Sequence, residues 1–321
     1  KSSYPKIVQI LVADGRSTDR TADIVHELSL EDKRIELVDN PDRLQAAGLN
    51  RLITMAEGEL FLRADAHCEY ASDYVEEAVE AYITSGALNV GGHQRFVAKN
   101  NVQAYIALAV DSFLGSGGAL YRDVSYRGYA DTVFLGCFDT VTLKKINGFI
   151  EDSVTNEDAE LNIRLEKLKK NAVYISPGIK VWYYPRKDIK SLFKQYYRYG
   201  KGRFLTVIRH DSRKSFRGST PFIAIILLLF LFTFLFLINK ALWVIAILFI
   251  LLTIVLLSVV RTVKRNFATF ETHIWRSGKD TVPGVFKRII GTFLVIVTMN
   301  VAHFCGFGVQ LLKSLAGKKS W

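Results

Sequence analysis

Two acidic clusters in this chain carry side chains that could bind a metal and remove a proton. Asp65-Ala66-His67 follows an apolar run, and Asn156-Glu157-Asp158 comes much later in the sequence. A divalent ion held by Asp65 and His67 would neutralise a diphosphate leaving group. A carboxylate of the second cluster would take a proton from an attacking hydroxyl. Together the clusters indicate group transfer from a diphosphate donor.

Each cluster also fits a purely structural role. On an extended segment Asp65 and His67 would share one face, which suits a bridging metal, but a lone Asp-x-His pair is more often just a solvated strand end. In the second cluster Thr155-x-x-Asp158 fits a capping box, and acidic residues favour helix N-termini. Both alternatives stay open on the sequence alone.

Strand and helix patterns alternate through the first hundred residues. The sequence predicts strands at 7–13, 34–38, 60–64 and 88–97, with helices at 21–28, 44–56 and 74–84. Such repeats predict an α/β fold with a mostly parallel sheet and helices on both faces. Ligands of these sheets bind beyond the carboxyl ends of strands, where Asp14 and Asp65 lie. Asp14 either accepts a hydrogen bond from a nucleotide base or caps the turn before Ser17.

The second half of the chain has the composition of a membrane domain. Residues 1–190 carry a net charge of −5, whereas residues 191–321 carry +16. The basic residues flank apolar runs, which favours membrane lipids over nucleic acid as the partner. The runs 221–238, 241–260 and 289–312 are each long enough to cross a bilayer. We therefore expect about three transmembrane helices in a multi-pass protein of the cell membrane.

The distribution of positive charge predicts the orientation in the membrane. Eight Lys or Arg residues precede the first run and seven lie between the second and third, so the globular domain is expected in the cytoplasm. Three crossings would put the C-terminus outside, and Lys313, Lys318 and Lys319 argue against that placement. The orientation of the third run is left open.

Three regions are expected: a globular domain at 1–187, an amphipathic interfacial segment at 188–217 and a membrane domain at 218–321. Within the interfacial segment, Arg198 could meet diphosphate oxygens and Tyr199 could stack on a sugar. A second interfacial helix is suited by four apolar residues in the loop between the second and third runs: Phe267, Phe270, Ile274 and Trp275.

Four motifs in a fixed order carry a family resemblance. They are Asp14-Gly-Arg-Ser17-Thr-Asp19, Arg63-Ala-Asp65-Ala-His67, Asn156-Glu-Asp158 and Gln195-x-x-Arg198-Tyr199. Together they resemble the family-2 inverting glycosyltransferases, above all membrane-anchored exopolysaccharide enzymes of the succinoglycan-biosynthesis type. The resemblance covers residues 7–205 and the C-terminal apolar runs, and it is specific for the family but not for the sugar.

The resemblance implies a nucleotide-sugar-binding fold of the GT-A type with a UDP-sugar donor and Mg²⁺ or Mn²⁺ as cofactor. By motif, Asp14 would contact the uracil, and Asp65 the ribose and the metal. His67 stands where the family usually has the second Asp of a D-x-D motif, and an imidazole can bind Mn²⁺. Asp158 would be the base, with Glu157 beside it near the acceptor.

The resemblance also implies a lipid-linked or polysaccharide acceptor. Gln195, Arg198 and Tyr199 resemble the Q-x-x-R-W element of polysaccharide synthases, with Tyr in place of Trp. Gln195 and Tyr199 would lie on the acceptor or lipid side, and Arg198 would contact the donor.

The chain begins at what the family pattern has as its second strand, so we expect an incomplete sheet with an exposed edge. The leading hypothesis is a membrane-anchored inverting transferase at the cytoplasmic face. A processive polysaccharide synthase and a non-catalytic membrane scaffold subunit are the alternatives. Tyr199 weighs against the synthase, whereas the missing strand and His67 favour the scaffold.

Overall fold

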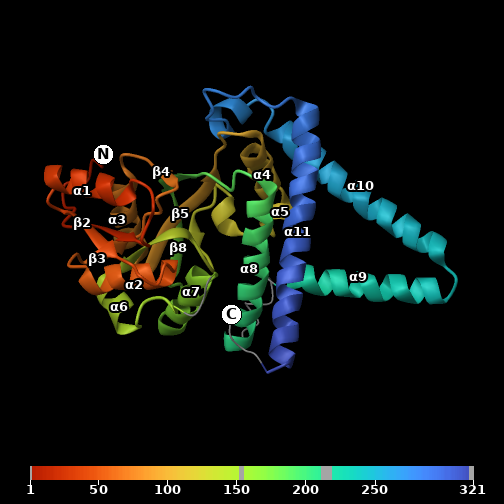
Figure 1. Cartoon of the computed structure of the whole chain (residues 1–321), viewed down its shortest axis with the longest axis horizontal. Helices are drawn as coiled ribbons and strands as arrows, with labels where there is room; N and C mark the ends of the chain where they lie inside the picture. Colours follow the sequence, from red (N-terminus) through yellow and green to blue (C-terminus); the bar gives the residue numbers. More distant parts are fainter. Residues whose placement is uncertain (1, 152–154, 211–218, 318–321) are drawn as a thin grey trace. The chain divides into compact units, whose positions relative to one another are not determined.

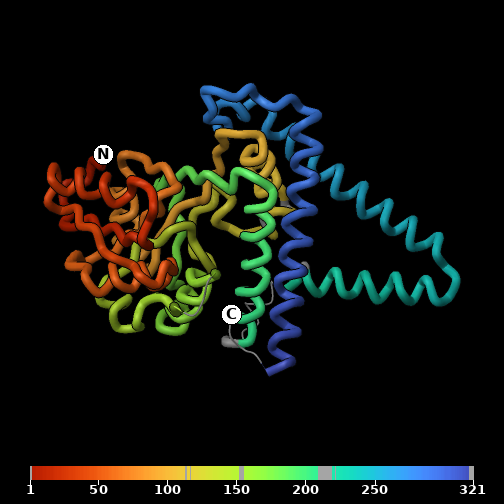
Figure 2. Tube along the Cα trace, viewed as in Figure 1, coloured from red at the N-terminus to blue at the C-terminus, as the bar shows by residue number. Residues whose placement is uncertain are grey.

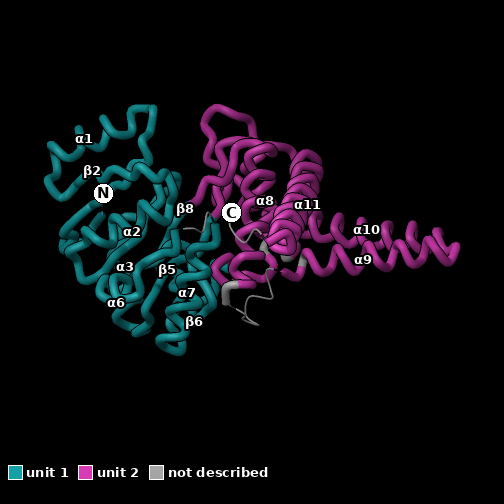
Figure 3. The backbone as a smooth tube through the Cα atoms, turned by 60° about the horizontal axis from the view of Figure 1, so that its bottom comes forward, with its two compact units in different colours: residues 1–95, 123–182 teal, residues 96–122, 183–321 magenta. Residues whose placement is uncertain are grey.

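The computed structural model describes residues 2–151, 155–210 and 219–317. The chain divides into two compact units, of which unit 1 comprises residues 1–95 and 123–182 and unit 2 comprises residues 96–122 and 183–321. Figure 1 labels the elements, Figure 2 traces the backbone and Figure 3 colours the two units. Segment 96–122, expected in the globular domain, groups with unit 2. Part of the expected interfacial segment, 211–218, lies outside the described residues.

Unit 1 alternates strands and helices over its first ninety residues, and each element predicted there is found within a few residues of its expected place. Its elements are β1 (Ile10–Asp14), α1 (Thr21–Glu31), β2 (Ile35–Asp39), α2 (Gln45–Met55), β3 (Leu60–Leu62), β4 (Cys68–Tyr70), α3 (Tyr74–Ser85), β5 (Asn89–Phe96), β6 (Gly128–Tyr129), β7 (Phe134–Asp139), α6 (Thr140–Lys145), α7 (Glu157–Leu168) and β8 (Val173–Tyr183). The α/β class is confirmed.

The expectation of a mostly parallel sheet is wrong. β1 and β2 pair in parallel as a separate two-stranded sheet, with Asp14 opposite Asp39. The larger sheet has the order β3-β7-β5-β8-β4, with β6 joined to β8. The β3–β7, β5–β7 and β6–β8 pairs are antiparallel. β1 and β2 are parallel, as expected for two strands joined by one helix, α1. β3 pairs instead with β7, a strand much further along the chain, so no single connecting helix determines the direction of that pair.

Helices cover both faces of the larger sheet, as expected. Val90 of β5 packs in a cluster with Ala78 of α3. The adjacent residue, Asn89, bonds instead to Asn162 of α7. Neighbouring residues of a strand point to opposite faces, so α3 and α7 lie on opposite sides of β5.

Unit 2 is mainly helical, and four of its helices are long. Its elements are α4 (Asn101–Asp111), α5 (Phe113–Ser116), a 3₁₀ turn (Leu120–Arg122), α8 (Ile189–His210), α9 (Thr220–Leu237), α10 (Ala241–Arg265), a short π-helix (Phe270–Ile274) and α11 (Val285–Leu315). α10 and α11 are long and apolar enough to cross a membrane, whereas the apolar part of α9, Phe222–Leu237, is shorter. The expectation of three spans stays a prediction.

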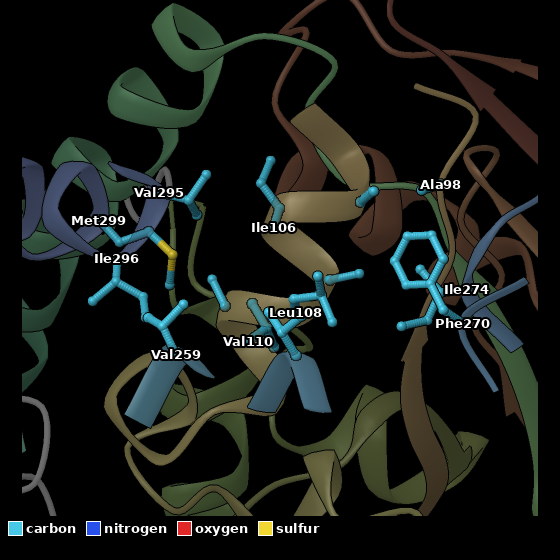
Figure 4. Close-up of a cluster of buried hydrophobic side chains, with 14 of the residues drawn as sticks. Ala98, Ile106, Leu108, Val110, Val259, Phe270, Ile274, Val295, Ile296 and Met299 are labelled. Carbon is cyan, nitrogen blue, oxygen red and sulfur yellow. The ribbon is translucent and has the colours of Figure 1, made fainter. Parts of the chain in front are cut away.

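The core of unit 2 joins α4, α10 and α11 to the segment after α10 (Figure 4). Phe270 is fully buried, and Ile274 and Trp275 are 8% and 7% exposed. Backbone bonds from the Ala98 amide to the Ile274 oxygen and from the Arg276 amide to the Ala98 oxygen fix this segment. The expected interfacial placement is therefore wrong for Phe270, Ile274 and Trp275, because they belong to a protein core with α4, α10 and α11, whereas Phe267 is 61% exposed.

Gly92 in β5 allows the close strand contacts of the larger sheet. A Cβ there would collide with the backbone oxygen of Ile179 in β8. We expect Gly92→Ala to lower the free energy of unfolding by about 2 kcal/mol, the cost of overpacking a core. Gly278→Ala is the control, since a Cβ at Gly278 would meet open space. Thermal unfolding measures both, and equal midpoints for the two variants would contradict this account.

Candidate functional site

A buried arginine joins the two acidic clusters of unit 1. Arg63 is 4% exposed and follows β3 directly. Its Nε donates to Oδ1 of Asp65 at 3.0 Å and its Nη2 to Oδ2 at 3.3 Å. Its Nη1 donates to Oδ1 of Asp158 at 2.5 Å. Because a guanidinium presents its donors in a rigid fork, one side chain can hold both carboxylates. The structure thus brings Asp65 and Asp158 into one site.

The two acids at the start of α7 differ in their surroundings. Glu157 is 8% exposed, and burial, together with the charge of Asp158, raises its pKa to about 7. Burial also raises the pKa of Asp158, but the ion pair with Arg63 opposes the rise. The Asp158 side chain is still 42% exposed. Asp158 is therefore paired with a cation and partly open to solvent, whereas Glu157 is buried.

Gln45, the first residue of α2, connects Glu157 to Arg63. With its amide oriented to satisfy both partners, its nitrogen donates to Oε1 of Glu157 at 3.1 Å and its oxygen accepts from Nη2 of Arg63 at 2.7 Å. Gly48, one turn later, lets α2 lie against Ala13 of β1. Three elements, α2, α7 and the segment after β3, therefore meet at Arg63.

Buried hydrogen bonds fix α7 against the rest of unit 1. Asn89 of β5 donates to Oδ1 of Asn162 at 2.8 Å, and both side chains are 2% exposed. Arg164 pairs with the buried Glu160 at 2.8 Å and donates to the Ile146 and Gly148 oxygens after α6. Burying a polar side chain is costly unless it is hydrogen-bonded, so these contacts favour one position of α7, although Oδ1 of Asn89 has no hydrogen-bond partner among the described residues.

The capping-box alternative for the second cluster is not realised. The N-cap of α7 is Asn156 rather than Thr155, and its side chain makes no capping hydrogen bond. Asn156 has φ 64° and ψ 22°, a left-handed conformation that costs a non-glycine residue some free energy. Asp158 meanwhile bonds to Arg63. The strained backbone of Asn156 thus stands two residues before Asp158, whose carboxylate points to Arg63.

The first cluster lies in a turn rather than on an extended strand. β3 ends at Leu62, and the Cys68 amide bonds back to the Asp65 oxygen at 3.2 Å. The expectation of a shared strand face for Asp65 and His67 is therefore wrong. The Tyr70 hydroxyl bonds to both the Asp65 amide and the Asp65 oxygen, at 2.5 and 2.9 Å. This clamp holds the Asp65 backbone in place.

Asp14 lies at the end of β1, as expected, and takes the turn-forming role. Its carboxylate accepts hydrogen bonds from the Ser17 amide at 3.2 Å and the Ser17 hydroxyl at 2.5 Å. This contact fixes the turn after β1. Asp14 can still accept a hydrogen bond from a nucleotide base, because a carboxylate has further lone pairs. That role stays a prediction.

Gln195, Arg198 and Tyr199 belong to α8 in unit 2. Gln195 donates to the Tyr199 hydroxyl at 2.8 Å, one helical turn away, and the rings of Tyr196 and Tyr199 lie 5.3 Å apart. Arg198 is exposed. The roles proposed for these three residues toward donor and acceptor stay predictions.

The residues present are compatible with one divalent cation. No group of three or more His, Cys, Asp or Glu side chains is arranged to hold a metal in the described ranges. Mg²⁺ is commonly bound by one or two carboxylates together with substrate phosphates and water. Asp65 and the exposed His67 would supply two protein ligands, and the rest would come from a donor diphosphate and water.

Sequence reasoning missed the two residues that organise the site. Arg63 stood within a motif but received no role, and Gln45 received none at all. An arginine next to a strand-end acid was the available signal for Arg63. No comparable signal existed for Gln45, because its partners come from α7 and from the segment after β3.

Comparison with known proteins gives consistent matches. A family model described as "Glycosyl transferase family 2" matches residues 1–136. The succinoglycan biosynthesis protein ExoA of Rhizobium meliloti (strain 1021) is 33% identical over 222 residues, 68% of this chain and 67% of that protein. A Methanococcus voltae protein named dolichyl N-acetyl-alpha-D-glucosaminyl phosphate 3-beta-D-2,3-diacetamido-2,3-dideoxy-beta-D-glucuronosyltransferase is 30% identical over 212 residues, 64% of this chain and 66% of that protein. The chain spans about two thirds of each relative's length.

Solved structures show more distant similarity. The mannosyltransferase PcManGT from Pyrobaculum calidifontis, in complex with GDP-Man and Mn²⁺, matches with a TM-score of 0.49 at 15% identity, covering 97% of this chain and 80% of that one. S. aureus TarS 1–349 matches with a TM-score of 0.46 at 15% identity, covering 68% of this chain and 61% of that one.

Replacing Arg63 should destabilise unit 1. Arg63→Met leaves the carboxylates of Asp65 and Asp158 without their shared partner, and breaking a buried pair in this way costs about 3 kcal/mol. Arg51→Met is the control, since Arg51 pairs with Asp42 at the surface and such pairs contribute less than about 1 kcal/mol. Denaturant unfolding of the two variants measures the difference. Equal losses would mean that Arg63 does not hold the clusters together.

Glu157 should make stability depend on pH. Its folded-state pKa, about 7, exceeds the ordinary glutamate value of 4.5, so the unfolded chain releases this proton first and stability falls as pH rises between these values. The loss is fully present above the folded pKa. We expect Glu157→Gln to match the wild type at pH near 4 and to exceed it by about 2 kcal/mol at pH 8. Thermal unfolding across this range measures the gap, and a gap independent of pH would contradict the assignment.

Proposed function

This chain belongs to glycosyltransferase family 2, and on that premise we propose that it moves a sugar with inversion from a nucleotide-sugar to a lipid-linked or polysaccharide acceptor. The observation that carries the proposal is the shared contact of Asp65 and Asp158 with one buried guanidinium. The residues proposed as the base and as the donor-binding acid thereby belong to one site of unit 1.

We propose that the donor is a UDP-sugar. Asp14, at the end of β1, would accept a hydrogen bond from the uracil, and Asp65 would face the ribose and diphosphate. Arg198 would contact diphosphate oxygens as a charge-assisted donor. Mg²⁺ or Mn²⁺, bound through Asp65 and His67, would neutralise charge on the leaving diphosphate.

Asp158 would act as the general base. Its carboxylate would take the proton of the acceptor hydroxyl while that oxygen attacks the anomeric carbon. The bond from the anomeric carbon to the diphosphate oxygen would break at the same time, and the nucleoside diphosphate would leave with the electron pair. Arg63 holds Asp158 by one oxygen, which fixes the direction of the carboxylate. Glu157, beside the base, would contact the acceptor.

We propose that the reaction takes place at the cytoplasmic face of the cell membrane in exopolysaccharide or other glycan synthesis. One relative is named for succinoglycan biosynthesis and the other for a dolichyl phosphate-linked sugar, which supports a lipid-linked acceptor. The apolar helices of unit 2 and the basic residues flanking them support membrane attachment with the globular unit inside. Gln195 and Tyr199 would lie on the acceptor side.

The proposal is tested by screening UDP-sugars for UDP release in membranes that contain the protein. We expect release with one or two donors, and Asp158→Asn should lower the rate by about 10²- to 10⁴-fold, the usual contribution of a general base. Product length in the same assay distinguishes a single transfer from processive synthesis.

The matched control removes an acid that pairs with an arginine at the surface. Asp42 pairs with Arg51 at 3.0 Å, and both side chains are well exposed. Asp42→Asn should keep the rate of the wild type. Undiminished turnover in a folded Asp158→Asn protein would remove Asp158 as the base.

A further inference from the structure

The α9–α10 hairpin is apolar on every side. No charged residue occurs from 220 to 239 or from 241 to 260. Large side chains point outward along both helices, including Phe230 (73% exposed), Leu237 (74%) and Phe249 (69%). A helix that is hydrophobic all round has no stable place in water. The 18 residues of α9 give a length of about 27 Å, close to the thickness of a bilayer hydrocarbon core.

α11 has different surroundings, because α8 lies alongside it (Figure 1). A Cβ on Gly200 of α8 would collide with the His303 oxygen of α11, and one on Gly306 of α11 would collide with the Tyr197 oxygen of α8. The Phe204 and Phe307 rings lie 5.2 Å apart. Two helices with small residues at such close approach form one packed pair.

The packed pair carries charge along its length. The basic residues of α8 among the described side chains are Lys190, Lys194, Arg198, Lys201 and Arg203. If α11 crossed the bilayer, α8 would bring these groups into hydrocarbon, where ionised side chains are rare and costly. At a headgroup layer the same groups meet anionic lipid.

The hairpin runs crosswise to the α8–α11 pair. Figures 1 and 3 show α9 and α10 extending together away from α11, in two views turned by 60°. α9 meets α11 at its beginning, where Phe222 stacks on Phe304 and Phe307 with ring centroids 5.1 and 4.5 Å apart. α10 returns to the core of unit 2 at its end, through Val259 and Val263. The hairpin and α11 therefore cannot both follow the bilayer normal.

We propose that only the α9–α10 hairpin enters the hydrocarbon core and that α11 lies in the plane of the membrane, beside α8, at the headgroups of one leaflet. The exposed side chains of α11 form an apolar stripe at helical spacing, comprising Ile290, Leu294, Val297, Val301 and Leu312. In an interfacial helix such a stripe faces the acyl chains while basic residues stay at the surface.

This placement revises the expected third span, 289–312, and explains the charge of the C-terminal end. With α11 in the membrane plane, Lys313 near its end lies on the same side as the basic residues that flank the hairpin. The positive-inside rule is then satisfied along the whole membrane domain, with Lys240 at the hairpin tip as the exception. The inference concerns membrane attachment and does not depend on the proposed reaction.

A labelling experiment on sealed membrane vesicles tests the two ends of α11 against the hairpin tip. Lys33→Cys marks unit 1, Lys240→Cys marks the tip and Leu315→Cys marks the end of α11, and each of these positions is exposed. A membrane-impermeant maleimide is applied to either face, with the parent chain as the control for Cys68 and Cys305. We expect positions 33 and 315 to react from one face and position 240 from the other. Labelling of position 315 from the same face as position 240 would overturn the proposal. Labelling of position 240 from the same face as position 33 would also overturn it.

A depth measurement gives a second readout that does not depend on vesicle orientation. Ile290→Cys, Val301→Cys and Leu312→Cys place a fluorophore on one face of α11, since positions eleven apart share a face, and they span about 33 Å of helix. Lipids brominated at defined acyl positions serve as quenchers. We expect equally shallow quenching at all three positions, with deep quenching at Leu248→Cys of α10 as the positive control. Maximal depth at position 301 would show a crossing helix and overturn the proposal.

Discussion

The candidate site depends on one buried positive charge surrounded by three acids. Without the Arg63 guanidinium, the carboxyl groups of Asp65, Glu157 and Asp158 would lie close together with no cation between them, which disfavours their charged forms. With it, the ion pair opposes the rise that burial causes in the pKa of Asp158, while burial raises the pKa of Glu157 to about 7. The cation is therefore what allows several acids to share this small region.

The sequence predicted the elements of unit 1 well because their signals are local. Apolar runs, turn residues and amphipathic helices up to residue 97 suffice to place every strand and helix there except the short β4, which was not predicted. Strand direction in the larger sheet was not predictable in the same way. β3 pairs with β7, which lies more than seventy residues away, and the segment 96–122 between them belongs to unit 2. Local patterns carry no information about such a partner.

The site shows the same division between local and distant information. Asp65 and Asp158 were predictable because acids at a strand end and at a helix start are visible in sequence. Their common contact with Arg63, and the bridging role of Gln45, depend on how α2 and α7 are placed around the sheet. In unit 2, Phe270 and Trp275 look interfacial in sequence, but α4 covers them. Apolar aromatic residues fit either environment, and only tertiary packing distinguishes the two.

The Asn89–Asn162 contact that fixes α7 is made by two neutral amides. An amide does not titrate, so this contact carries no charge that acid, alkali or salt can remove. The helix that bears Asp158 is thus attached to β5 by a neutral contact, in addition to the ionic contact between Arg164 and Glu160. Changes in pH or salt therefore act on α7 through its ionic side chains rather than through this contact.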